Sequence, residues 1–444
     1  MMTQTDILYG RGTLTVEHDE TCDVLRPGHT EVLPDQAGAV AEALARPIGS
    51  PPLSQIARAK IGGKVVVVIS DITRPVPNRV ILPPVLDVLR DAGHPDDAVT
   101  ILIATGMHRP STPDERVELV GPDIVERYRI VDHRAEQRDE LILLPTPTAS
   151  GTNVWINQLY AEADLKIVTG FIEPHFMAGY SGGRKAICPG LVNLETIQKF
   201  HSPAFLENPR ADSGVLDGNP CHVEAIEVAR RVGADFLVNV AVTTDQEITG
   251  VFAGDLEQAH LAGADAVADM MGIDVEREYD VVVTCGGGYP LDTTFYQAVK
   301  GMVLATPFVR QGGTMVIASS CTQGIGSDIY LDIMRRYADG RWRDFIEDIK
   351  ASDRVEKDQW EFEMQCRVLR KVAVDGLVFV TDGVDAATLG ACSVRPAPGC
   401  GETGRPTQQV LDDVLASLRT EHPRATWAVI PTGPYILPRV PAAR

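Results

Sequence analysis

The chain has 444 residues, which at about 150 residues per domain suggests two or three domains. Hydrophobic residues make up 44% of it and charged residues 23%, and this balance excludes a disordered chain, a collagen and a small disulfide scaffold. The 41 Lys and Arg against 61 Asp and Glu give a formal net charge of −20. A surface this acidic repels nucleic acid and anionic membranes, so we expect neither as a partner, although a local cationic pocket can still bind an anionic substrate.

Short runs rich in Val and Ile recur along the chain. Continuous β-branched runs of this length are typical of strands that are buried on both faces, as in parallel sheets. The expected strands are 64–70 (KVVVVIS), 99–105 (VTILIAT), 165–170 (LKIVTG), 236–242 (FLVNVAV), 280–284 (DVVVT), 313–319 (GTMVIAS), 376–381 (GLVFVT) and 426–431 (TWAVIP).

Amphipathic helical patterns lie between these strands. The expected helices are 84–92, 221–232, 256–271, 293–310 and 407–418. Because strand and helix alternate, we predict an α/β fold with right-handed crossovers and mostly parallel sheets. The charged break at 271–279 (MGIDVEREY) precedes a fresh strand, so we place a boundary there and predict two α/β domains, residues 1–272 and 273–444.

The eight cysteines are scattered and form no CxxC pair. This spacing favours free thiols in a reducing compartment over a disulfide framework or a Cys-rich metal site. The first twelve residues are polar, unlike a signal peptide, and no apolar run approaches the length of a membrane span. We therefore expect a cytoplasmic protein.

Loops that contain Gly, Pro or charged side chains directly follow four of the expected strands. These loops are 71–75 (DITRP), 106–110 (GMHRP), 171–175 (FIEPH) and 285–288 (CGGG). In open α/β sheets ligands bind beyond the carboxyl ends of the strands. We expect the loops to converge, with the active site in the cleft between the two domains.

Two histidines, His108 and His175, each follow a buried strand within a Gly/Pro-rich turn. Imidazole titrates near neutrality. Two such side chains on opposite sides of a substrate therefore suit an enzyme that acts as acid and base on both faces of one carbon. His222 is expected in the first turn of a helix. The histidines without this context, expected at the surface, are His18, His29, His94, His133, His260 and His422.

The segment 179–186 (GYSGGRKA) is similar to a phosphate loop but lacks its second Gly and its magnesium-binding hydroxyl, which argues against a P-loop NTPase. Lys185 is more informative, because a neighbouring cation, Arg184, disfavours the charged ammonium and makes the lysine a better nucleophile or attachment point. His201 follows sixteen residues later. A third histidine in the same site favours a metal such as zinc, nickel or copper.

In the second half, 289–301 (YPLDTTFYQAVKG) opens a helix that Asp292 or Thr293 can cap. Tyr296 and Lys300 are four residues apart and share a face, and Gln297 lies beside Tyr296. Polar side chains near a helix N-terminus suit an anionic ligand.

Together, these segments resemble the nickel-pincer nucleotide-dependent lactate racemase family. The resemblance runs from about residue 70 to residue 360. It is carried jointly by SDITRP (70–75), ATGMHRP (104–110), EPHFMAGYSGGRKAICPG (173–190), His201 and TTFYQAVKGM (293–302).

The family's cofactor is a pyridinium-3,5-bisthiocarboxylic acid mononucleotide that holds nickel. The resemblance implies that Lys185 carries this cofactor, that His201 is the nickel ligand, and that His108 and His175 transfer protons. It implies further cofactor contacts from Asp71, Ile72, Thr73, Arg74, Gln297 and Lys300. It also implies substrate contacts from Arg74, Tyr296, Lys300 and Trp360.

Arg184 departs from the small residue that we expect before the lysine in this family. We expect its cation to face the tail of a longer or more polar acid, such as a dicarboxylate or a sugar acid.

The resemblance implies a racemase or epimerase that inverts C2 of a 2-hydroxy acid. One histidine removes the hydroxyl proton while the C2 hydride moves to the cofactor, and the second returns a proton after the planar 2-oxo intermediate has turned. Soft sulfur ligands with imidazole suit square-planar nickel. Three alternatives stay open: a zinc-dependent hydrolase or lyase that uses His108, His175 and His201, a non-catalytic anion- or nucleotide-binding homologue, and a pyridoxal-phosphate enzyme with Lys185 as its Schiff base.

Overall fold

A computed structural model describes residues 2–28, 30–352 and 354–440. The chain divides into two compact units. The central unit contains residues 29–201 and 208–270, and the C-terminal unit contains the residues up to Gly28, Ser202–Glu207 and the chain from Met271 onward. The predicted division at residue 272 is close to the last crossing between the units, but it assigns the first 28 residues and Ser202–Glu207 to the other side.

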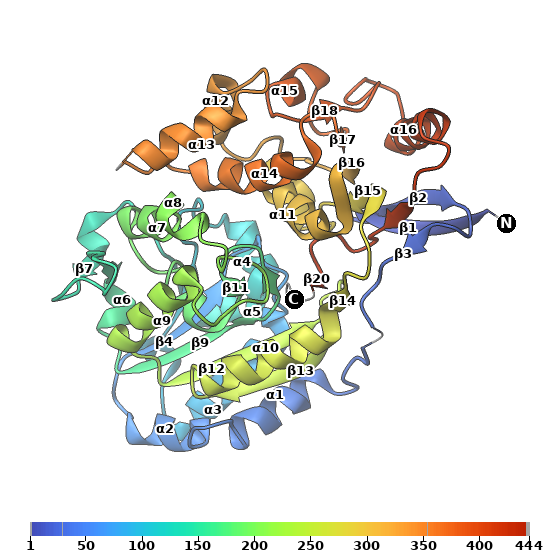
Figure 1. Ribbon diagram of the computed structural model, residues 1–444. Coiled ribbons are helices and arrows are strands. Elements are labelled where there is room, and N and C mark those ends of the chain that lie inside the picture. Colours follow the sequence, from blue (N-terminus) through green and yellow to red (C-terminus); the bar gives the residue numbers. More distant parts are fainter. Residues whose placement is uncertain (1, 29, 353, 441–444) are drawn as a thin grey trace. The chain divides into compact units, whose positions relative to one another are not determined.

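The central unit is built on a six-stranded sheet with the order β13-β12-β9-β4-β5-β6 (Figure 1). All neighbours are parallel except β12 and β13. The strands are β4 (Val65–Ser70), β5 (Val99–Ala104), β6 (Arg129–Asp132), β9 (Leu165–Phe171), β12 (Phe236–Val242) and β13 (Ile248–Gly254). The strand order reverses between β4 and β9, and ligands of such sheets bind at that switch point, beyond the carboxyl ends of the strands.

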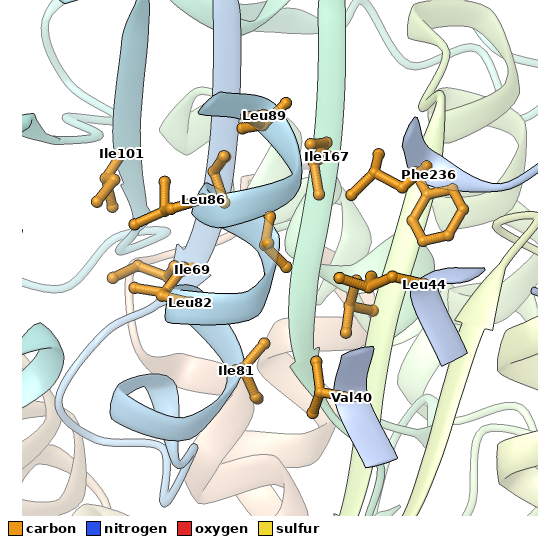
Figure 2. Close-up of a cluster of buried hydrophobic side chains, with 14 of the residues drawn as sticks. Val40, Leu44, Ile69, Ile81, Leu82, Leu86, Leu89, Ile101, Ile167 and Phe236 are labelled. Atoms are coloured by element: carbon orange, nitrogen blue, oxygen red, sulfur yellow. The ribbon is translucent and has the colours of Figure 1, made fainter. Parts of the chain in front are cut away.

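The core of the central unit lies between this sheet and three helices, α1 (Gln36–Ala45), α2 (Leu53–Ala59) and α3 (Asn78–Ala92). Figure 2 shows side chains of α1, α3 and the strands meeting in this core. The alternate side chains of the same strands are also buried, as at Val68 and Val168. The sheet is therefore covered on both faces, as its continuous apolar strands predicted.

The C-terminal unit has a second six-stranded sheet, with the order β18-β17-β16-β15-β19-β3, and every pair in it is parallel. Its strands are β3 (Asp23–Val24), β15 (Tyr279–Cys285), β16 (Val309–Ala318), β17 (Leu377–Val380), β18 (Arg395–Pro396) and β19 (Trp427–Val429). Its helices are α8 (Pro203–Leu206), α11 (Phe295–Ala305), α12 (Asp328–Arg336), α13 (Trp342–Ala351), α14 (Gln359–Val372), α15 (Ala386–Gly390) and α16 (Thr407–Glu421). The first residues of the chain belong to this unit because β3 completes its sheet beside β19.

Further helices of the central unit are α4 (Pro113–Val120), α5 (Pro122–Arg127), α6 (Gln158–Ala161), α7 (Leu194–Phe200), α9 (Pro220–Val232) and α10 (Gln258–Met271). Short antiparallel pairs join β1 (Thr3–Tyr9) to β2 (Gly12–His18), β7 (Leu141–Leu143) to β8 (Trp155–Asn157) and β10 (Pro174–His175) to β11 (Gly179–Tyr180), and a parallel pair joins β14 (Gly272–Asp274) to β20 (Leu437–Arg439). Within the described ranges, no helix combines the length and the apolar character that crossing a bilayer requires.

Several histidines that were expected at the surface are buried. They are His18, His94, His133 and His260, whereas His422 is exposed and His29 lies outside the described residues. His133 is typical: its Nε2 donates to the carbonyl of Val192 at 2.9 Å and its Nδ1 accepts from the amide of Asn157 at 3.2 Å. The sequence gives no sign of such partners, which come from segments 24 and 59 residues away.

The buried His133 makes stability depend on pH. Burial lowers the pKa of His133 to about 4, against 6.5 for an exposed imidazole. Between these values the unfolded chain binds a proton that the folded chain does not, so stability falls as the pH is lowered through this window, by up to about 1.4 kcal/mol per pH unit. We expect His133→Gln to lose less stability than the parent between pH 6.5 and pH 4.5 in urea unfolding. His422→Gln is the control, and an unchanged slope in His133→Gln would contradict the assignment.

Candidate active site

His108 and Asp71 form a hydrogen-bonded pair at the carboxyl end of the central sheet. Asp71 directly follows β4, and His108 lies four residues beyond β5, the neighbouring strand. The two side chains meet at 2.6 Å between Nδ1 and Oδ2, with Asp71 buried and His108 half-buried. Burial raises the pKa of Asp71, but the charge and hydrogen bond of His108, together with Arg74 and Thr73, more than offset this and hold it below its usual value. The carboxylate therefore orients the imidazole ring of His108.

The loop after β4 is ordered around the same carboxylate. Thr73 donates to Oδ1 of Asp71 from its hydroxyl at 2.7 Å and from its backbone N–H at 3.3 Å. In Arg74, the guanidinium nitrogen Nη1 is buried and makes no hydrogen bond within the part of the chain that the structure describes. Ile72 packs against the apolar core instead. A buried cationic nitrogen without a partner is costly, so this loop suits an anionic ligand.

His175 follows β9 and occupies the short hairpin of β10 and β11. It is 6% exposed, and its Nδ1 accepts from the backbone N–H groups of Met177 and Ala178 at 3.3 and 3.4 Å. An Nδ1 that accepts is unprotonated, so the neutral ring carries its proton on Nε2. In His108 the carboxylate of Asp71 holds the proton on Nδ1, which leaves the lone pair on Nε2. At Nε2, His108 thus presents a lone pair and His175 presents an N–H.

Lys185 lies in a tight turn that two adjacent glycines, Gly182 and Gly183, make possible. Gly182 and Gly183 have φ of +74° and +51°, and a Cβ on Gly182 would lie 2.6 Å from Oδ1 of Asn239. The same Oδ1 accepts from the N–H of Gly183 at 2.8 Å, and the turn continues as a 3₁₀ helix, Gly183–Ala186. This turn presents Lys185 as a half-buried side chain.

His201 ends α7, where its Nδ1 donates to the carbonyl of Ile197 at 2.8 Å. This bond leaves the lone pair on Nε2, the form in which imidazole ligates a metal. Burial, with a smaller contribution from the charge of Lys185, lowers the pKa of His201 to about 3, although its hydrogen bond to Ile197 acts in the opposite direction. The ring is therefore neutral, and Lys185 lies close enough to act on it.

The described residues contain no group of three His, Cys, Asp or Glu side chains that could hold a metal ion. His108, His175 and His201 therefore do not form the ligand set that the zinc-hydrolase alternative requires. A single protein ligand for nickel, with the other donors coming from a cofactor, does not need such a set.

Arg184 does not face a substrate tail, which corrects that expectation. It is 1% exposed, and its guanidinium binds inside the central unit to His260 and to the carbonyl of Ala178. The adjacent Lys185 and Arg184 point to different surroundings because successive side chains of a 3₁₀ helix are about a third of a turn apart.

The residues expected on the C-terminal unit gather at the start of α11 and of α14. Trp360 donates from its indole N–H to the hydroxyl of Tyr296 at 2.8 Å. Gln297 and Lys300 are buried on α11, and Oε1 of Gln297 accepts no hydrogen bond from the described residues. The cap of α11 is Thr294, not Asp292 or Thr293. Asp292 is buried instead and accepts from the N–H groups of Gly10 and Ser320.

Sequence reasoning missed two residues that support the Lys185 turn, Asn239 and His260. The sequence did indicate a special role for Asn239, because it is the one polar residue in the apolar strand 236–242. There was no such indication for His260, since it lies on a helix whose pattern is unremarkable and reaches Gly183 only in the folded chain.

Two family models match the chain. The lactate racemase N-terminal domain matches residues 9–214, and the lactate racemase C-terminal domain matches residues 275–416. The chain belongs to the lactate racemase family. The resemblance read from the motifs is confirmed, and the chain is an isomerase of the racemase type that acts on a small molecule.

Curated relatives in the family agree along most of the chain. The lactate racemase of Thermoanaerobacterium thermosaccharolyticum is 35% identical over 93% of this chain and 96% of its own length. The lactate racemase of Lactiplantibacillus plantarum is 36% identical over 86% of this chain and 90% of its own.

Solved structures confirm the α/β fold with mostly parallel sheets. The lactate racemase apoprotein from T. thermosaccharolyticum matches with a TM-score of 0.87 and 33% identity, covering 98% of this chain and all of that one. A Thermotoga maritima protein matches with a TM-score of 0.69 at 17% identity, over 91% of this chain and 98% of that one, and shares the fold alone.

Proposed function

We propose that the protein inverts C2 of a 2-hydroxy acid by proton-coupled hydride transfer, with a nickel-pincer nucleotide held on Lys185. The observation that carries this proposal is the opposite hydrogen bonding of His108 and His175. A racemase needs one group that accepts the hydroxyl proton and another that faces the oxygen with a proton, and the lone pair on Nε2 of His108 and the N–H on Nε2 of His175 suit these roles.

The side chains at the candidate site suit attachment of the cofactor and binding of its nickel. Lys185 is the attachment amine, His201 offers Nε2 to the nickel, and the charge coupling between these two side chains supports their closeness. Asp71, Thr73, Arg74, Gln297 and Lys300 are the proposed polar contacts, among which Nη1 of Arg74 is buried without a partner in the described residues. When bound, the nickel-pincer nucleotide supplies the acceptor for the hydride of C2.

The chain's own residues move the proton. Nε2 of His108 takes the hydroxyl proton, and the carboxylate of Asp71 stabilises the imidazolium that forms. The N–H on Nε2 of His175 would contact the oxygen from the other side, and the proton held by His108 as imidazolium balances the one returned to the product oxygen, so that neither ring is left as an imidazolate. By microscopic reversibility, the opposite direction starts from the protonation state of the two histidines in which the first direction ends.

The substrate carboxylate is proposed to bind Arg74 or Lys300. Arginine suits a two-point contact with a carboxylate, and lysine suits a single one. Both curated relatives are lactate racemases, so lactate is the first acid to test. The burial of Arg184 removes the argument for a dicarboxylate or sugar acid.

The deciding experiment uses the full chain produced with and without the cofactor-making enzymes. We expect the loaded protein to carry extra mass on Lys185 and about one nickel, and to racemise lactate or another member of a 2-hydroxy acid panel. Loaded protein that carries the mass but turns over no acid would favour a non-catalytic homologue. Protein that holds zinc and no added mass would overturn the proposal.

A further inference from the structure

The chain crosses from the central unit to the C-terminal unit directly after His201. It belongs to the C-terminal unit from Ser202 to Glu207 and returns to the central unit at Asn208. We call the segment Ser202–Glu207 the strap. The side chain that is proposed to ligate nickel is therefore joined by one peptide bond to a segment that folds with the other unit.

The strap is short and stiff. Ser202 and Pro203 open its one-turn helix α8, and proline fixes the backbone angle φ at the first helical position. The N–H groups of Phe205 and Leu206 donate to the carbonyl of Ser202 at 2.9 Å. The N–H of Glu207 donates to the carbonyl of Pro203 at 3.0 Å. Because the turn is hydrogen-bonded throughout, a displacement at one end of the strap is passed to the other.

The far end of the strap is anchored on α13 and α14, against which α8 packs. Oε2 of Glu207 lies 2.5 Å from Nζ of Lys350, and Nη2 of Arg370 donates to both carboxylate oxygens at 3.0 Å. Burial raises the pKa of Glu207, but the hydrogen bonds and charges of these two cations more than offset this and hold it below its usual value. Arg367 also donates to the carbonyl of Leu206.

The near end of the strap is anchored in the central unit. Phe200 is fully buried, and its ring meets the His201 ring edge-on, with 4.8 Å between the centroids. The carbonyl of Phe200 accepts from Sγ of Cys221 at 3.6 Å, and Nδ1 of His201 donates to the carbonyl of Ile197. The place of Nε2 of His201 is thus set by α7 on one side and by the strap on the other.

We propose that Glu207 is a positioning residue, which docks the strap on α13 and α14 and thereby holds the His201 ring in the place where it ligates nickel. The inference deepens the proposed function, on which its consequence for nickel rests. Its structural consequence, the place of the His201 ring, does not depend on that function.

The first test follows the His201 ring in the full chain without cofactor. Nitrogen NMR of histidine-labelled protein resolves the ring nitrogens, and His201→Gln identifies the His201 signals. In Glu207→Gln, which keeps the volume and loses the charge, we expect the His201 signals to shift or broaden. His133 is the internal control, because its hydrogen bonds lie within the central unit. His201 signals that coincide with those of the parent would overturn the proposal.

A second variant covers failure of Glu207→Gln to fold. Lys350→Gln weakens the same anchor from the exposed side, and we expect a smaller shift of the His201 signals. The double variant should shift them no further than Glu207→Gln alone, because both changes remove one interaction. The matched control is Lys371→Gln, which breaks the ion pair of α14 with Glu278 instead. Parental signals in Lys350→Gln, or an equal shift in Lys371→Gln, would contradict the anchoring role.

The second test uses protein loaded with the cofactor. Added imidazole competes with His201 for the nickel, and the change in the visible absorption of the metal measures this competition. We expect Glu207→Gln to reach half-displacement at an imidazole concentration roughly fivefold lower than the parent, and Lys371→Gln to match the parent. Equal concentrations in the parent and Glu207→Gln would overturn the proposal. A parent that takes up no nickel-pincer nucleotide would contradict the proposed function, and the NMR result would then decide the inference.

Discussion

Replacing Lys185 by arginine is expected to abolish both cofactor attachment and racemase activity. The amine of Lys185 is the proposed attachment point, and a guanidinium keeps the charge but does not form the same amide-type bond. Intact-mass measurement of Lys185→Arg, produced alongside the cofactor-making enzymes, should show the mass of the unmodified chain. Activity on lactate should fall to background.

The matched control is Lys64→Arg, the same chemical change at an exposed lysine of the central unit. We expect it to retain both the added mass and the activity. Full loading of Lys185→Arg would place the cofactor on another residue and would refute the central assignment.

Replacing His108 by glutamine is expected to lower kcat by about 10²–10⁴, the usual contribution of a positioned acid or base. His175→Gln should have a similar effect, and the double variant should lose little more, because the two groups act in one sequence of proton transfers. Asp71→Asn should lose less than His108→Gln, since it removes the orienting carboxylate but leaves the base. Lactate turnover, monitored by circular dichroism, measures all four.

The control for this series is Arg109→Gln. Arg109 is the exposed neighbour of His108, and its guanidinium pairs with Glu115. We expect near-parental kcat from it. Parental activity in either single histidine variant would show that the proton passes elsewhere.

The strands were predictable because their signal is local. Parallel strands that are buried on both faces must be apolar throughout, so β4, β5, β9 and β12 stand out in the sequence. The loops that follow them end near one another for the same topological reason, which is why Asp71 and His108 could be expected to meet. Their pairing at 2.6 Å follows from the neighbouring positions of β4 and β5 in the sheet.

Helices with atypical patterns were harder to predict. The start of α3 is hidden by Pro83 and Pro84, which lie inside the helix rather than before it. The pattern of α14 misleads in a different way, since polar side chains such as Glu363 and Gln365 are fully buried on it. Such burial depends on partners from distant segments, as when Gln365 donates to the carbonyl of Cys392.

The surroundings of the Arg184 side chain also could not be predicted from the sequence. An arginine beside a lysine in a glycine turn is expected to be exposed, because most arginine side chains in folded proteins are exposed. Only the folded chain brings the carbonyl of Ala178 and the ring of His260 to the guanidinium. The expected substrate contact of Arg184 failed for this reason.

The edge strand β3 has a consequence for how the protein is made. Residues 23 and 24 leave the ribosome about four hundred residues before their partner β19. The sheet of the C-terminal unit therefore cannot be completed during most of translation, whereas the central sheet can form as soon as residue 254 has emerged. A circularly permuted gene that moves the first 28 codons to the end would let the two sheets fold one after the other.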